Sequence, residues 1–165
     1  MTKREDHIAR VNYNLRTLGV LSKAAQQDST DWQITIAFYS ALHAVQAHLS
    51  GYPGIDINSH KDLDLIISPE SSFSQFRLPI ELHADYEELL NLSRKARYLC
   101  QKAESAPTLT GSFLKHSNLR KALFRLDRLL THYQEQLSVQ FERVKIFCSE
   151  CSLDDKKKFN VLEVV

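Results

Sequence analysis

Residues 32–50, WQITIAFYSALHAVQAHLS, decide the fold class of this chain. Apolar and aromatic side chains recur along this stretch at steps of three and four residues, which is the period of an α-helix. They form two stripes, namely Phe38, Leu42, Val45 and Leu49, and Trp32, Ile36, Tyr39 and His43. Because a helix with apolar residues on two sides is contacted from both, the stretch predicts a central helix of a helical domain.

The residues on either side mark where this central helix begins and ends. Thr30 is predicted as its N-cap and Gln33 as the capping-box partner, because their side chains satisfy backbone N–H groups that the first turn leaves unpaired. Gly51, Pro53 and Gly54 follow the stretch and predict its end.

Four further helices are predicted from the same periodicity and from cap signals. The segments are residues 3–27, 60–67, 79–104 and 113–148. Ser59 with Asp62 predicts a second capping box, which opens the short helix. The last helix carries a near-heptad apolar stripe from Leu119 to Val144. Such a stripe packs either in the core of the bundle or against a second copy of the chain, so the sequence also predicts a homodimer.

The composition supports a helical fold. The 165 residues include only four Gly and four Pro, too few for a fold of hairpins, which needs turn residues at short intervals. We therefore expect an all-α, four- to five-helix up-and-down bundle without a sheet. Residues 1–150 are predicted to form this single domain. Residues 151–165 show no helical period and are expected to be a loose or partner-docked tail.

Charge is unevenly distributed although the net charge is only +1. Residues 31–93 carry nine acidic and two basic side chains, whereas residues 94–128 carry nine basic and two acidic ones. The basic stretch either holds phosphates or pairs with acidic residues of the same chain or of a partner. Both interpretations stay open at the level of sequence.

Cysteine content and hydropathy bear on location and cofactors. The three cysteines are Cys100, Cys148 and Cys151. An odd number without a secretory signal indicates a reducing, cytoplasmic setting. Cys148 and Cys151 form a CxxC motif that has no second ligand pair, so no metal and no cofactor is predicted. No apolar run reaches the roughly 20 residues that cross a bilayer.

Three motifs, in this order, resemble those of the HEPN superfamily, and more closely those of small bacterial HEPN-like proteins. They are FYSALHAVQAHL at 38–49, SHKD at 59–62 and LSRKARYL at 92–99. The resemblance implies a bundle of four or five helices and frequent homodimers. It also implies association with RNA cleavage, toxin–antitoxin pairs, phage defence or nucleotide binding.

The chain departs from the motif of the RNase members of that superfamily. Those members carry Arg followed by His after four to six residues, because His moves protons for attack by the ribose 2′-OH and Arg stabilises charge on the phosphate. No His follows Arg97 within that range. Two formal matches lie elsewhere, Arg77 with His83 and Arg125 with His132.

Five residues in the matched motifs are the candidate site. His43, His60, Arg97 and Tyr98 are the candidate catalytic residues, and His60, Arg94 and Arg97 are the candidate ligand-binding residues. In a groove they supply an acid or base, a phosphate clamp and a stacking partner. In the core they form an inert polar network that fixes the helix register.

Three functions are compatible with these features. The first is a binding module for RNA or a nucleotide, or for a nucleotidyltransferase, toxin–antitoxin or phage-defence partner. The second is a metal-independent endoribonuclease with a divergent His/Arg site. The third is a purely structural helical subunit.

Overall fold

The computed structural model confirms the predicted all-α class in its described part, apart from one very short pair of strands. It describes residues 3–25, 29–52, 55, 57, 59–98, 114 and 116–165. The helices are α1 (Arg4–Ala25), α2 (Thr30–Leu49), α3 (His60–Ile67), α4 (Ile80–Tyr98), α5 (His116–Leu137) and α6 (Leu153–Lys156). The strands are β1 (Lys145–Ile146) and β2 (Glu163–Val164), and Ser74–Phe76 forms a 3₁₀ turn.

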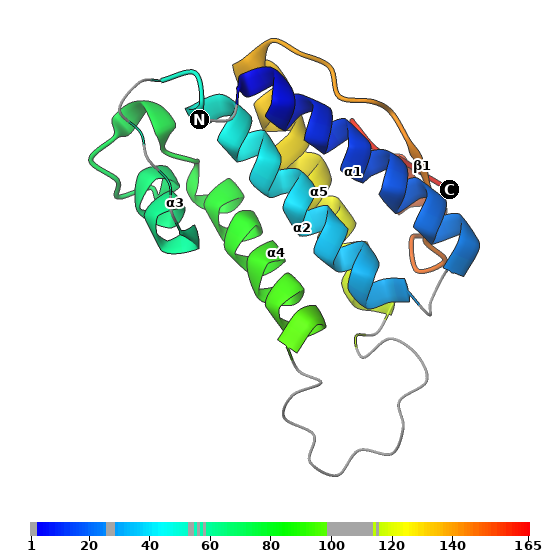
Figure 1. The fold of residues 1–165 in the computed structure, drawn as a ribbon. Helices are drawn as coiled ribbons and strands as arrows, with labels where there is room; N and C mark the ends of the chain where they lie inside the picture. The colour runs from blue at the N-terminus through cyan, green and yellow to red at the C-terminus, as the bar shows by residue number, and fades with distance from the viewer. Residues whose placement is uncertain are drawn as a thin grey trace.

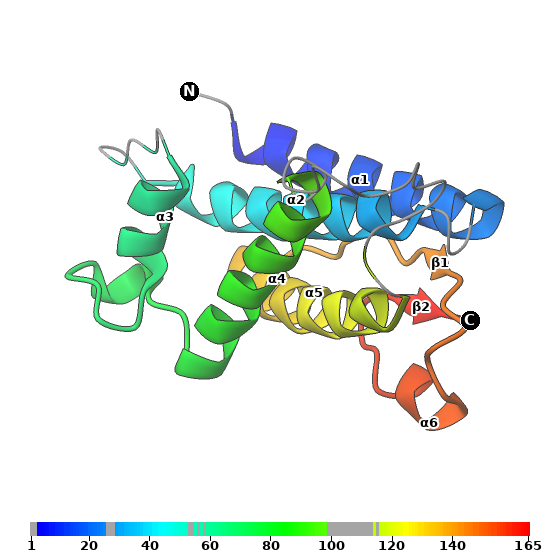
Figure 2. The ribbon, with the colours of Figure 1, turned by 90° about the horizontal axis from the view of Figure 1, so that it is seen from below.

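Helix α2 is central, as its two stripes predict. It contacts α1, α4 and α5, and Figure 1 shows it lying between α1 and α4 with α5 behind. Its Phe38, Leu42 and Val45 are buried in the core. Seen from below, α3 lies at one end of the bundle and the strands and α6 lie at the other (Figure 2). No helix in the described ranges has the length and apolar character needed to span a membrane.

The start of α2 differs in detail from the prediction. Ser29, not Thr30, occupies the N-cap position, and its Oγ accepts a hydrogen bond of 2.8 Å from Gln33 Nε2. Thr30 instead begins the helix, where its Oγ1 lies 3.1 Å from His116 Nδ1. At α3 the predicted cap is present, because Ser59 Oγ accepts the Asp62 N–H at 3.1 Å.

The prediction of a helix as far as residue 148 is wrong, because α5 ends at Leu137. Ser138 adopts a left-handed conformation with φ of 53°. The Ser138 N–H donates to Glu135 O at 3.3 Å and the Val139 N–H donates to Gln134 O at 3.1 Å. This is the Schellman pattern that closes helices, usually with Gly at the left-handed position. Because serine rather than glycine occupies this position, the sequence does not show where the helix ends.

An extended segment follows α5 and runs along α1. The Glu142 N–H donates to Asn12 Oδ1 at 3.0 Å and the Phe147 N–H donates to Ser22 Oγ at 3.0 Å. Side chains of α1 thus satisfy backbone groups that a neighbouring strand would otherwise satisfy. Gly19 lies where this segment passes close to α1, because a Cβ there would stand only 2.9 Å from Lys145 O.

The segment 151–165, expected to be loose or partner-docked, packs onto the bundle of its own chain. It buries several apolar side chains, Phe159, Val161, Leu162 and Val164. Its end forms β2, which pairs in parallel with β1, so the expectation of no sheet is also corrected. Each strand is only two residues long, which is too short to show an alternating pattern in the sequence.

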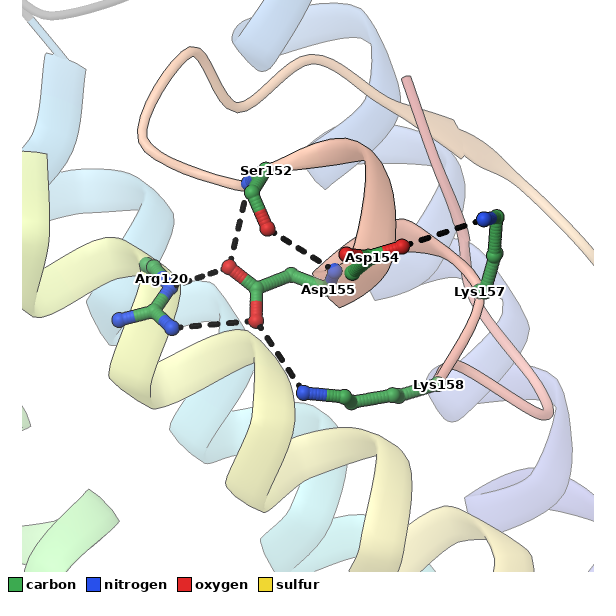
Figure 3. A network of polar contacts seen from close by, with 6 residues as sticks. All are labelled: Arg120, Ser152, Asp154, Asp155, Lys157 and Lys158. Atoms are coloured by element: carbon green, nitrogen blue, oxygen red, sulfur yellow. Dashed lines mark hydrogen bonds and ion pairs between the residues drawn. The ribbon is translucent and has the colours of Figure 1, made fainter.

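Polar contacts fix this C-terminal segment in place. Arg120 of α5 donates from Nε and Nη2 to the carboxylate of Asp155, at 3.0 and 3.1 Å (Figure 3). Ser152 and Asp155 form a reciprocal capping box that opens α6. The hydrogen bonds from Arg120 hold the pKa of Asp155 well below its usual range. The carboxylate therefore remains charged and paired at neutral pH.

The apolar stripe of α5 is covered within the chain. Its members Leu119, Leu123, Leu126, Leu130, Tyr133 and Leu137 are all buried in the bundle core. The stripe could pack in the bundle core or against a second copy of the chain. Its helical part packs in the core. Phe141 and Val144, assigned to the same stripe, lie on the extended segment instead.

Candidate functional site

The groove between α3 and α4 contains a cavity of about 220 Å³. It is lined by His60, Lys61, Asp64, Glu87, Leu90, Asn91 and Arg94. The Ser59 cap sets the first residue of α3, so His60 and Lys61 occupy its first turn and Asp64 lies one turn later. The residues of α4 that line the cavity recur at steps of three and four, and therefore share one face of that helix.

The two ends of the groove differ in charge. At one end, His60 lies within electrostatic reach of Arg94 and Arg97. At the other end, Asp64 Oδ1 lies 2.8 Å from His83 Nε2. Burial, followed by the charges of Arg94 and Arg97, lowers the pKa of His60. His60 is consequently a neutral imidazole at physiological pH.

Two cations that line the cavity have no acidic partner among the described residues. In the described ranges, neither Arg94 nor Lys61 lies within ion-pair distance of a carboxylate, although both line the cavity. An arginine in such a position presents a planar set of donors that matches a phosphate.

The basic residues of α5 behave differently. Arg125 pairs with Glu88 at 3.0 Å, and Arg128 pairs with Asp85 at 3.0 Å. Arg120 pairs with Asp155, as described above. The structure thus divides the basic stretch 94–128. Its α5 arginines pair with acidic residues of the same chain, whereas Arg94 of the α4 portion lines the cavity.

Arg97 joins the groove to α2. Its Nη1 lies 3.2 Å from Tyr39 Oη, and its guanidinium carbon lies 5.6 Å from the centroid of the Tyr39 ring. The neighbouring Phe38 ring lies 5.5 Å from the ring of His60, centroid to centroid. The structure therefore brings His60, Arg94 and Arg97 together where α2, α3 and α4 meet.

His43 lies elsewhere, against α1. Its Nδ1 lies 3.1 Å from Nδ1 of His7, and the two ring centroids are 5.4 Å apart. Burial, followed by the charges of His7 and Arg10, lowers the pKa of His43 to about 4. His43 is one turn from Tyr39 on α2, but the ring that it contacts, His7, belongs to α1. The side chain of Tyr98 lies outside the described residues.

The first formal Arg–His match consists of residues with different partners. Arg77 Nε donates to Ser71 O at 2.6 Å. His83, in contrast, interacts with Asp64 and Glu87. In the second match, Arg125 pairs with acids of α4 as described above, and the ring of His132 contacts the ring of Tyr133 at 5.1 Å.

Two groups of side chains have metal-binding chemistry. The first consists of Asp64, His83 and Glu87, whose donor atoms all lie within 4.8 Å of one another. The second is the CxxC pair, in which Cys148 and Cys151 are buried free thiols. A hydrogen bond from the Cys151 side chain lowers the pKa of Cys148. Cys100 lies outside the described residues.

Several residues of the groove were missed by sequence reasoning. His83 and Glu87 are four apart on a predicted helix, so their shared face was visible in the sequence. The approach of Asp64 and Lys61 was not visible, because it depends on how α3 packs against α4.

Comparison of the chain with protein-family models, with curated protein sequences and with solved structures found no match. Function is therefore inferred from the groove itself and from the resemblance to HEPN proteins.

Proposed function

We propose that this chain is a helical-bundle binding module that holds RNA or a nucleotide by a phosphate group, in the groove between α3 and α4. The observation that carries the proposal is the pair Arg94 and Lys61, which line the cavity without an acidic partner in the described ranges. The arginines of α5 pair with acids of the same chain, whereas these two cations are available to a phosphate.

The groups around the cavity suit the parts of a nucleotide. Arg94 donates two parallel hydrogen bonds to a phosphate, and Lys61 adds a point charge. Asn91 offers both a donor and acceptor for a ribose hydroxyl or a base edge. Tyr39, with Arg97 stacked on its ring, lies next to the groove and offers a surface on which a base can stack.

The resemblance to HEPN proteins adds a partner to the proposal. We expect the module to form a homodimer and to act with a nucleotidyltransferase, a toxin–antitoxin partner or a phage-defence effector. Two buried free thiols are compatible with a reducing compartment such as the cytoplasm. Sedimentation at micromolar concentration checks the dimer, and a purely monomeric species would contradict it.

The experiment that tests phosphate binding compares Arg94→Gln with Lys95→Gln. Both residues are exposed on α4 and both changes remove one positive charge, but only Arg94 lines the cavity. Binding of a short fluorescent single-stranded RNA is followed by anisotropy, with ATP as competitor. Losing a hydrogen bond to a charged group costs about 1.5–3 kcal/mol, so Arg94→Gln is expected to weaken binding roughly 10- to 100-fold.

The salt dependence gives a second readout. Removing one phosphate contact lowers the slope of log affinity against log salt by about 1. Lys95→Gln is expected to change affinity by less than about threefold. Equal effects of the two variants would show that RNA is held by general charge and would contradict the groove as the site.

The alternative is a metal-independent endoribonuclease with a divergent site, and one observation favours it. His60 is a neutral imidazole beside Arg94 and Arg97, so it can accept a proton from a 2′-OH. If the chain is such an enzyme, it is expected to cleave RNA in the presence of EDTA. His60→Asn is then expected to abolish cleavage while RNA binding persists. Binding without cleavage supports the module, and absence of both leaves the structural subunit.

A further inference from the structure

We infer that the acidic end of the same groove is a site for a divalent transition-metal ion, with Asp64, His83 and Glu87 as its protein ligands. This site shares the cavity with the proposed phosphate site but does not depend on it. It also goes against the expectation from sequence, which predicted no metal.

The three side chains come from two helices that line the same cavity. His83 and Glu87 lie one turn apart on α4, with His83 Nδ1 3.8 Å from Glu87 Oε2. Asp64 reaches across from α3, with Oδ1 2.8 Å from His83 Nε2. Nitrogen and oxygen ligands bind zinc at about 2.0–2.2 Å, so two of them lie roughly 3–3.5 Å apart around a tetrahedral ion. A small rotation of the Asp64 side chain therefore replaces the hydrogen bond with an ion that Asp64 Oδ1 and His83 Nε2 both bind.

The packing of His83 favours a defined site. Only 13% of its side chain is exposed, against 42% for Asp64 and 55% for Glu87. The imidazole is thus held in place, while the two carboxylates retain freedom to adjust. With Nε2 on the ion, the half-exposed Glu87 side chain has the freedom to swing onto the ion as the third protein ligand.

Among the described residues, no nearby cation balances the charge of the cluster. Within the described ranges, no Lys or Arg lies within ion-pair distance of Asp64 or Glu87. On the neighbouring face of α4, Asp85 and Glu88 each have an arginine partner. The cavity reaches Asp64 and Glu87, so an ion bound there has room for water or a phosphate oxygen.

A buried hydroxyl beside the cluster is a second observation. Tyr86 is 0% exposed, and its Oη has no hydrogen-bond partner among the described residues. Asp64 and Arg94, which both line the cavity, are the charged groups within electrostatic reach of this hydroxyl. Buried polar groups are rarely left unpaired, and an ion or ordered water is a common partner.

The donor set selects the class of ion. One imidazole nitrogen with two carboxylates suits Zn²⁺, Co²⁺ or Mn²⁺. Mg²⁺ and Ca²⁺ prefer sites made of oxygen alone. The chain also contains a competing soft site, because the buried thiols of Cys148 and Cys151 lie together, and thiolates bind the same ions.

Titration of the whole protein with Co²⁺ distinguishes these two locations. Binding of one equivalent near neutral pH is expected to give visible d–d bands without a thiolate charge-transfer band. Cys148→Ser is expected to leave the spectrum unchanged. His83→Gln and Asp64→Asn are expected to weaken Co²⁺ binding at least 10-fold, whereas Glu81→Gln, an exposed acid on the same helix, leaves it unchanged. Zn²⁺ is expected to displace Co²⁺, and excess Mg²⁺ is not.

Three outcomes overturn the metal site. They are no Co²⁺ binding by the folded protein, binding that survives both His83→Gln and Asp64→Asn, and a thiolate band that Cys148→Ser removes. Far-UV circular dichroism in EDTA checks that each variant is folded. If His83→Gln does not fold, Co²⁺ binding by Asp64→Asn decides the test, because Asp64 is half-exposed. RNA binding measured in EDTA is independent of this result, so failure of the metal site and failure of the phosphate site are separable.

Discussion

Removing the carboxylate of Asp127 is expected to detach the C-terminal segment from the bundle. Asp127 lies on α5 with 2% exposure and accepts three backbone N–H groups. Its Oδ2 accepts from Asn160 at 2.8 Å, and its Oδ1 accepts from Val161 at 2.9 Å and from Leu162 at 2.8 Å. One side chain thereby satisfies the backbone of three consecutive residues that precede β2.

The magnitude follows from these contacts. Hydrogen bonds to a charged acceptor contribute about 1.5–3 kcal/mol each, but three that share one carboxylate are not additive. Asp127→Ala leaves three N–H groups without an acceptor, and we expect a loss of about 3–5 kcal/mol, similar to breaking a buried ion pair. Asp127→Asn keeps one oxygen for two of the groups and sets an NH₂ against the third. We expect it to cost about 1.5–3 kcal/mol.

Urea unfolding followed by circular dichroism measures the free energy, and hydrogen exchange locates the change. Peptides covering 159–165 are expected to lose protection in Asp127→Ala, while peptides of α1 and α2 keep it. Asp154→Asn is the control, because the one ion pair of Asp154 among the described residues is with an exposed Lys157, and an effect within about 0.5 kcal/mol is expected. A cost of Asp127→Ala below about 1 kcal/mol, or unchanged protection of 159–165, would refute the reasoning.

Three further perturbations test other contacts. Gly19→Ala is expected to lower the free energy of unfolding by about 1–3 kcal/mol, because the new Cβ collides with Val144 and Lys145 O; a neutral result in urea unfolding would mean that the extended segment is not held against α1. Ser138→Gly is expected to raise stability by about 1 kcal/mol, because it relieves a left-handed conformation with φ of 53°, and a lower thermal midpoint would contradict this. Burial lowers the pKa of His43 to about 4 from 6.5, so the unfolded chain binds more protons between these values. Stability is therefore expected to fall by about 1–2 kcal/mol, allowing for solvent screening, as pH drops through this window. His43→Gln is expected to flatten the dependence, and an unchanged slope would exclude His43 as its source.

The helices were predictable because their signals are local. The central helix was expected to follow an N-cap at Thr30 and to run to about residue 50, and it spans Thr30–Leu49, since its apolar stripes are dense and Gly51 follows directly. The start of α3 was equally readable from Ser59 and Asp62. The end of α5 was not, because the left-handed residue that closes it is Ser138 rather than glycine. Its conformation is maintained by backbone hydrogen bonds that leave no mark in composition.

The C-terminal segment shows the limit of periodicity. Its strands are two residues long, too short for an alternating pattern. Its position depends on Asp127 and Arg120, which lie on another element more than 30 residues away. From sequence, Asp127 counted only as an acid within a basic stretch.

The candidate site likewise has features that follow from local sequence and features that depend on helix packing. The sequence by itself determined that His60, Arg94 and Arg97 lie on helices at positions able to share a groove, because helical spacing assigns each residue to a face. Only the tertiary structure decided that Arg94 and Lys61 face a cavity while Arg125 and Arg128 are neutralised, and that Asp64 meets His83. Electrostatic interactions extend over only a few ångströms at full strength. Whether a cation is paired or available therefore depends on how the helices pack, which no local pattern records.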